Sequence, residues 1–154
     1  MAAPYCYEYP RPSLTVDLAV FAEVGGKTLV LLIRRKHDPF AGRWAIPGGF
    51  LEMDETAETA ARRELKEETG VNHDGPVAFL GVWDAPGRDP RGRTISLAHV
   101  ASVDGTPPRP TGADDAEESA WVDVETATGL AFDHDEILKA ALRWRKRRRG
   151  RSRG

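Results

Sequence analysis

Three glutamates with helical spacing are the residues of this sequence best suited to chemistry. Glu64, Glu67 and Glu68 stand at positions i, i+3 and i+4 of a segment without Gly or Pro, which is predicted to be a helix. On a helical wheel, Glu64 and Glu68 fall within the stripe of alanines and Leu65 that would face the core. Crowded inward carboxylates must be neutralised, paired or bound to a cation, and Mg²⁺ prefers such oxygen ligands. A solvated acidic patch is the alternative that this spacing alone leaves open.

The segment before this helix carries little side-chain bulk. Pro47-Gly48-Gly49 would let a loop lie against the helix and point backbone groups at a bound ion or phosphate. The same glycines could equally serve only a turn. The helix itself is predicted over residues 56–69, with Asp54 as its N-cap and Gly70 at its end.

The rest of the pattern predicts the elements that must position these residues. Apolar and β-branched runs predict strands at 14–24, 27–33, 77–84, 94–103 and 119–124, and a short, broken extended segment at 44–51. Gly25-Gly26 would form the first hairpin turn, and Asp133 would cap a last helix over about 134–147. Strands outnumber helices and the helices are segregated, so we expect an α+β domain with a mixed sheet flanked by helices.

Length and composition are those of a soluble domain. The chain has 154 residues, of which 40% are hydrophobic and 30% charged, enough for one domain with a real core. Its apolar runs are far shorter than the roughly 20 residues of a membrane span, and its N-terminus lacks the pattern of a secretory signal. The single Cys6 excludes an internal disulfide and a thiolate metal cluster. We therefore expect a cytoplasmic protein that does not engage a membrane.

Charge is distributed unevenly along the chain. The net charge is −2, yet eight basic residues and no acid lie from Arg143 onward, so the preceding body is strongly acidic. We expect one domain over residues 1–142 and a basic, flexible tail over residues 143–154. Such a tail could bind nucleic acid or an anionic surface, but a solvated helix end that frays is the favoured interpretation.

The glycine-rich loop and the helix together resemble the Nudix box. Gly49 is followed after five residues by Glu55, and after seven more by the run Arg63-Glu64-Leu65-Lys66-Glu67-Glu68-Thr69-Gly70-Val71, so every defining position is filled. Weaker likeness extends from Val16 to about Leu138. The resemblance implies the Nudix fold, a mixed β-sheet sandwiched between α-helices. It also implies hydrolysis of a nucleoside diphosphate linked to another group.

The resemblance assigns roles within the box. The carboxylates of Glu64, Glu67 and Glu68 would be catalytic metal ligands, with the Gly48 carbonyl as a further ligand, for Mg²⁺ or alternatively Mn²⁺. Structural support of the site would come from Gly49 and from an ion pair between Glu55 and Arg63.

An acid on a late loop often supplies the general base in this family. We choose Glu117 for that role, although Asp114, Asp115 and Glu118 also qualify.

One loop bears on the substrate. Family members similar to ADP-ribose pyrophosphatases carry a proline about fifteen residues after the box, and Pro86 stands at that distance from Val71. The three arginines of the same loop, Arg88, Arg91 and Arg93, suit a diphosphate, although an exposed turn with incidental charge is the alternative. Further candidates for phosphate binding, at the ends of short strands, are Arg34, Arg35 and Arg43. The expected reaction is hydrolysis of ADP-ribose to AMP and ribose 5-phosphate.

Two other functions fit the same sequence. A Nudix enzyme could act on a dinucleoside polyphosphate or a damaged nucleotide, and a non-catalytic nucleotide- or RNA-binding module could draw on the basic tail. Nudix-like regulators often have degraded boxes and a separate DNA-binding domain, for which we expect no room in this length. The expected partner is a small-molecule nucleotide, and a homodimer is compatible with the resemblance.

Overall fold

The computed structural model describes residues 4–112 and 116–153, except for the side chains of residues 116 and 117. Nine elements follow one another along this part of the chain. They are β1 (Ser13–Val24), β2 (Lys27–Arg35), β3 (Trp44–Ala45), β4 (Gly48–Phe50), α1 (Ala57–Thr69), β5 (Val77–Trp83), β6 (Thr94–Ser102), β7 (Ala116–Asp123) and α2 (His134–Arg151).

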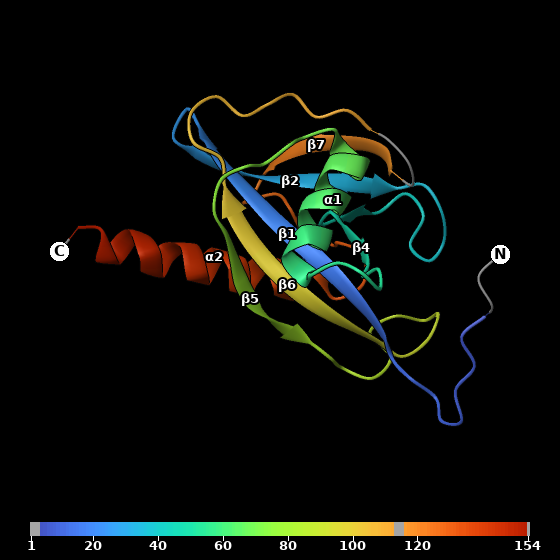
Figure 1. Cartoon of the computed structure of the whole chain (residues 1–154). Helices are drawn as coiled ribbons and strands as arrows, with labels where there is room; N and C mark the ends of the chain where they lie inside the picture. Colours follow the sequence, from blue (N-terminus) through green and yellow to red (C-terminus); the bar gives the residue numbers. More distant parts are fainter. Residues whose placement is uncertain (1–3, 113–115, 154) are drawn as a thin grey trace.

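The strands form one mixed sheet whose main path runs β3-β2-β1-β6-β5. β1 pairs antiparallel with β2 and parallel with β6, while β4 pairs with the first half of β1 and β7 with β2. Gly25 and Gly26 both have positive φ, as the tight turn between β1 and β2 requires. α1 covers one face of the sheet and α2 the other (Figure 1). The expected α+β arrangement, a mixed sheet between helices, is confirmed.

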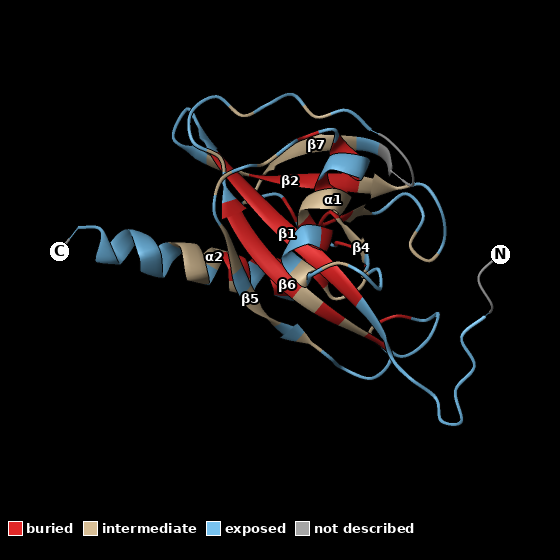
Figure 2. Ribbon diagram, viewed as in Figure 1, coloured by how far each residue is buried: buried red, intermediate tan, exposed pale blue. Residues whose placement is uncertain are grey.

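Alternation along β1 divides the core into two layers. Leu18 packs with Leu65 of α1, whereas Phe21 packs with Ile137 of α2, and all four side chains are fully buried. Each contributes about 1.5–3 kcal/mol through burial. Asp17 has the same parity as Phe21, so its carboxylate lies on the α2 side of the sheet. Buried residues concentrate in β1, β2 and β6 (Figure 2).

The N-terminus of α1 differs from the prediction. Thr56, not Asp54, is the N-cap, and its hydroxyl accepts a hydrogen bond of 3.2 Å from the Thr59 N–H. The helix begins later than Asp54 would allow because Glu55 turns inward to bind Arg63. Gly70 ends the helix in the left-handed conformation, as expected.

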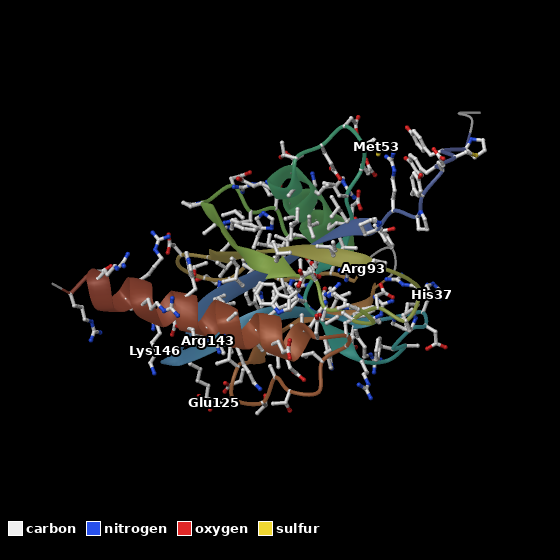
Figure 3. The ribbon with its side chains drawn as sticks, turned by 90° about the horizontal axis from the view of Figure 1, so that it is seen from below. His37, Met53, Arg93, Glu125, Arg143 and Lys146 are labelled. Atoms are coloured by element: carbon white, nitrogen blue, oxygen red, sulfur yellow. The ribbon has the colours of Figure 1, made fainter. Side chains whose placement is uncertain are left out.

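α2 continues through Arg151, four residues beyond the expected end. Its contacts with the sheet extend to Trp144, which packs on the core, and Arg145, which binds Glu23 and Thr28, and the helix is exposed from Lys146 onward (Figure 3). Asp133 occupies the N-cap position without a side-chain capping bond, because its carboxylate binds Arg88 instead. No helix in the described part of the chain is long and apolar enough to cross a membrane.

Candidate functional site

A cavity of about 780 Å³ lies where α1, β4, the 84–93 loop and the start of α2 meet. This volume is within the range of small-molecule sites. Its walls differ from side to side: carboxylates of α1 form one side, arginines and phenylalanines form the mouth, and a buried Asp–His pair lies toward α2.

Glu68 is the most buried acid of α1, with 5% of its surface exposed. One of its oxygens, Oε1, accepts a 2.9 Å hydrogen bond from the Gly48 N–H. Burial raises the pKa of Glu68 well above its ordinary value, and the nearby charges of Glu64 and Asp17 add to the rise. The helix therefore presents a carboxylate whose ionised form needs a cation.

Glu64 lies beside Glu68 and against the glycine-rich strand β4. Burial also raises the pKa of Glu64. A Cβ atom at Gly49 would overlap the Glu64 carboxylate, so glycine leaves the space that this side chain occupies. Gly48 is equally constrained, because a Cβ there would overlap the Val16 carbonyl and the Asp17 carboxylate.

Arg63 ties the acids of this region together. Its Nε and Nη2 donate to the two oxygens of Glu55 at 2.9 and 2.6 Å, and Nη2 also donates to the Phe50 carbonyl at 3.1 Å. Its Nη1 donates to Glu64 at 2.9 Å and to Glu67 at 3.1 Å. One guanidinium thus braces the loop before α1 and holds two of the three helical carboxylates.

These residues fit a divalent cation in their chemistry. Their donors are hard carboxylate oxygens, Glu68 is buried with a raised pKa, and Glu64 and Glu67 share the positive charge of Arg63. Within the described residues, no three His, Cys, Asp or Glu side chains converge closely enough to enclose an ion. Arg63 binds Oε1 of Glu64 and Oε2 of Glu67, so ion binding would require the second oxygen of each carboxylate to turn toward Glu68 while these hydrogen bonds are kept.

The Glu55–Arg63 pair leads to a prediction for stability against pH. Hydrogen bonds from Arg63 lower the pKa of Glu55 from 4.5 to about 2. Because the pKa is lower in the folded state, the ionised Glu55 contributes its full share of the free energy of unfolding above pH 4.5. This contribution is lost as the pH falls toward 2. In urea titrations with EDTA, the difference in unfolding free energy between wild type and Glu55→Gln should therefore shrink over that interval. The control Glu58→Gln, at an exposed position, should differ little from wild type in unfolding free energy, and this difference should hardly change with pH. The same behaviour in Glu55→Gln would show that the Glu55–Arg63 pair does not cause the pH dependence.

The 84–93 loop is anchored to α2 by a buried ion pair. Arg88 donates from Nε and Nη2 to the two oxygens of Asp133 at 2.9 and 2.6 Å, and only 4% of its side chain is exposed. Burial opposes the charged form of Arg88, but its hydrogen bonds to the Asp133 carboxylate and the negative charge of that group outweigh burial and raise the Arg88 pKa.

Removing Arg88 should leave an uncompensated carboxylate in a buried place. We expect Arg88→Met to lower the free energy of unfolding by about 3–5 kcal/mol, measured by urea denaturation. Arg93→Met is the matched control, because Arg93 is exposed and donates to a backbone carbonyl, that of Asp84. An Arg88→Met protein as stable as this control would show that the pair does not anchor the loop.

Arginines and phenylalanines meet at the mouth of the cavity. Arg91 is held by Asp89, with 2.8 Å between Nη2 and Oδ2, and its guanidinium lies over the rings of Phe50 and Phe132 at 5.3 and 5.7 Å. Arg35 lies over the Phe132 ring at 4.9 Å. The mouth therefore carries guanidinium groups flanked by aromatic rings, which suit an anionic nucleotide.

A buried polar group lies toward α2. The Asp17 carboxylate accepts a short hydrogen bond from the Ser96 hydroxyl, and its Oδ1 lies 3.4 Å from His134 Nε2. His134 Nδ1 accepts a 3.0 Å hydrogen bond from the Ile46 N–H. Burial lowers the pKa of His134.

The structure places most of the predicted site residues around this one cavity. Its lining includes Gly48, Gly49, Arg63, Glu64, Glu67, Glu68, Arg88 and Arg91, whereas Arg34, Arg43 and Pro86 are not part of it. Arg34 lies 3.4 Å from Glu118, and Arg43 lies over the Phe40 ring. Glu117 belongs to β7, and its side chain is outside the described part, as are Asp114 and Asp115. The substrate-binding and general-base roles stay predictions.

Of the three arginines predicted to flank the site, Arg35 lines the cavity, whereas Arg34 and Arg43 do not. Arg35 shares its face of β2 with Ile33, which also lines the cavity, and strand alternation turns Arg34 away. Strand alternation in the sequence predicts which side chains share a face of β2, but not which of the two faces lines the cavity. Sequence reasoning missed Asp17 and His134 as residues of the cavity. Asp17 could have been noticed as an acid between the apolar residues Val16 and Leu18 of a strand.

Comparisons with known proteins agree with this geometry. The NUDIX domain model matches residues 11–144. The chain is 42% identical to an ADP-ribose pyrophosphatase of Methanocaldococcus jannaschii over 89% of this chain and 77% of that protein. It is 36% identical to the ADPR responsive transcriptional repressor NtrR of Acinetobacter baylyi, over 88% of this chain but only 55% of the repressor.

Solved structures show the same fold. The NUDIX domain of Shewanella oneidensis NrtR, complexed with ADP ribose, superposes with a TM-score of 0.81 at 27% identity, covering 88% of this chain and 89% of that one. A bifunctional NMN adenylyltransferase/ADP ribose pyrophosphatase of Francisella tularensis, complexed with AMP and a Mn ion, gives a TM-score of 0.76 at 32% identity, covering 89% of this chain and 43% of that one. With its complete box folded around one cavity, the chain belongs to the NUDIX family and is a Nudix hydrolase.

Proposed function

We propose that this protein hydrolyses the diphosphate linkage of ADP-ribose, giving AMP and ribose 5-phosphate, with Mg²⁺ or Mn²⁺ as its cofactor. The observation that carries the proposal is the row of glutamates on α1, whose buried member Glu68 faces the same cavity as Glu64 and Glu67. The similarity to an ADP-ribose pyrophosphatase at 42% identity supports the choice of substrate.

Glu64, Glu67 and Glu68, together with the Gly48 carbonyl, would hold the cation. Once bound, it would supply Lewis acidity toward the diphosphate and activate the attacking water. The solved relative with AMP and a Mn ion supports this part of the proposal.

The protein's own groups would arrange the reaction. Arg63 keeps Glu64 and Glu67 in place from one side, while the Gly48 N–H fixes one oxygen of Glu68. Arg35 and Arg91 at the mouth would attract the diphosphate. One water adds to a phosphorus atom, the bridging P–O bond breaks, and Glu117 is the proposed acceptor of the water's proton. The two phosphates leave as AMP and ribose 5-phosphate.

A substrate panel tests the proposal. The protein is assayed with ADP-ribose, a dinucleoside polyphosphate and oxidised nucleoside triphosphates, each with Mg²⁺, with Mn²⁺ and with EDTA. We expect the highest kcat/KM for ADP-ribose, products in equal amounts, and no turnover in EDTA. A higher kcat/KM for another nucleotide would replace ADP-ribose with that substrate.

A second candidate is a sensor that binds ADP-ribose without cleaving it. The similarity to an ADPR responsive repressor favours it, although the chain spans little more than half of that protein. Saturable binding of ADP-ribose with no AMP formed in the panel would support the sensor and refute the hydrolase.

A further inference from the structure

We propose that Asp17 and His134 form a subsite that recognises the amino edge of adenine, and so selects adenine nucleotides. The inference rests on the proposed function, because it names the part of the substrate that reaches the α2 side of the cavity. Both side chains line the cavity and are more than nine-tenths buried.

The backbone fixes which atom of His134 donates. Because the Ile46 N–H donates to Nδ1 at 3.0 Å, Nδ1 carries no proton, and the ring proton of the neutral imidazole is on Nε2. Asp17 is fixed in turn by the Ser96 hydroxyl, which donates to Oδ2. The remaining Oδ1 lies 3.4 Å from Nε2, longer than the usual 2.7–3.2 Å of an N–H···O bond. A ligand would therefore find one acceptor and one donor side by side.

The surroundings suit a flat base rather than a sugar. Ile33 and Ala45 are buried in an apolar cluster with Ala131, against which Phe132 packs. Ile33, Ala45 and Phe132 all line the cavity, and Phe132 lies 5.4 Å from His134 between ring centroids. Apolar walls that end in a donor–acceptor pair match a nucleobase, whose faces are apolar and whose edge is polar.

The subsite adjoins Glu68 but lies on the other side of Gly48. Asp17 projects from the α2 side of β1, whereas Glu68 lies on α1 at the other side of the sheet, and Gly48 of β4 stands between them. The cavity extends to both. A nucleoside diphosphate can therefore place its phosphates by α1 and its base toward His134.

Adenine has the polarity that this pair requires. Its exocyclic amino group would donate to Asp17 Oδ1, and the adjacent ring nitrogen would accept from His134 Nε2. Hypoxanthine presents the reverse pattern. Its carbonyl oxygen would face the Asp17 carboxylate, and its ring N–H would face the N–H of His134. A buried mismatch of this kind leaves both protein groups unsatisfied.

Binding of AMP and IMP to the wild-type protein tests the inference without any turnover. In isothermal titration calorimetry, we expect AMP to bind on the order of 10- to 100-fold more tightly than IMP, the discrimination of one bidentate pair. Equal dissociation constants would overturn the assignment. If the pair instead holds a ribose diol, AMP and IMP will bind equally and 3′-deoxy-AMP will bind more weakly than AMP.

Asp17→Asn supplies the matched variant, because an amide can rotate to donate to the hypoxanthine carbonyl. We expect AMP to bind about 10-fold more weakly, and the AMP-to-IMP ratio to fall to about threefold or less. The control is Asp74→Asn, at an exposed position. Retention of the full wild-type ratio in Asp17→Asn would refute the inference, and if this variant fails to fold, the wild-type comparison decides. Failure of the proposed function is separate: it would show as AMP selectivity without hydrolysis of any nucleotide in the panel.

Discussion

Glu68→Gln should lower kcat for ADP-ribose by about 10³-fold while leaving the fold intact. Ligation of the cation by an ionised carboxylate supplies several kcal/mol of transition-state stabilisation, and 10³-fold corresponds to about 4 kcal/mol. A glutamine can keep the hydrogen bond from the Gly48 N–H, because its side-chain oxygen is also an acceptor. The substitution therefore removes the charge and preserves the shape. Single-turnover and steady-state assays at saturating Mg²⁺ measure the loss.

Thermal unfolding separates this effect from damage to the structure. In EDTA, the melting temperature of Glu68→Gln should equal or exceed that of wild type, because the variant no longer buries a carboxylate beside Glu64. Mg²⁺ should raise the melting temperature of wild type more than that of the variant. Glu58→Gln, on the solvent side of the same helix, should match wild type in both assays. Unchanged turnover in Glu68→Gln would end the proposed mechanism.

The acidic side of the cavity was predictable because its spacing is local. Glu64, Glu67 and Glu68 are brought together by the helix alone, and the apolar stripe around Leu65 identifies their inward face. The mixed sheet flanked by helices was likewise predicted from the number and order of strand and helix segments, and the structure confirms it with a helix on each face. In both cases the signal lies in local patterns of the sequence.

The α2 side of the cavity was not predictable because it depends on contacts between distant segments. Asp17, Ser96 and His134 meet only after β1 has paired with β6 and the start of α2 has packed against the sheet. No spacing in the sequence encodes these contacts. Arg88 and Asp133 are a similar case: the sequence marks Asp133 as a helix cap, but a guanidinium from another loop binds its carboxylate. A side chain whose local sequence predicts one interaction, such as helix capping, can thus bind a charged group that only the folded chain brings close to it.

Arg63→Lys is expected to impair both activity and stability although it preserves the charge. Five hydrogen bonds of the guanidinium reach Glu55, Glu64, Glu67 and the Phe50 carbonyl. An ammonium is a point charge with three donors, so it cannot span Glu55 on one side and the helical acids on the other. We expect kcat/KM to fall by about 10²-fold, the typical cost of losing an outer partner of a metal ligand. We also expect a lower melting temperature.

The Mg²⁺ dependence distinguishes positioning of the acids from a loss of stability alone. If Arg63 sets the arrangement of Glu64 and Glu67, Arg63→Lys should need a higher Mg²⁺ concentration for half-maximal activity even at a temperature where it is fully folded. Arg62→Lys is the matched control: Arg62 is the preceding arginine of α1, and it binds Glu58 and the His73 carbonyl, away from the cavity. A folded Arg63→Lys protein with the Mg²⁺ requirement of wild type would mean that Arg63 only braces the loop before α1. The affinity for Mg²⁺ would then be set by the α1 carboxylates and Gly48 without help from Arg63.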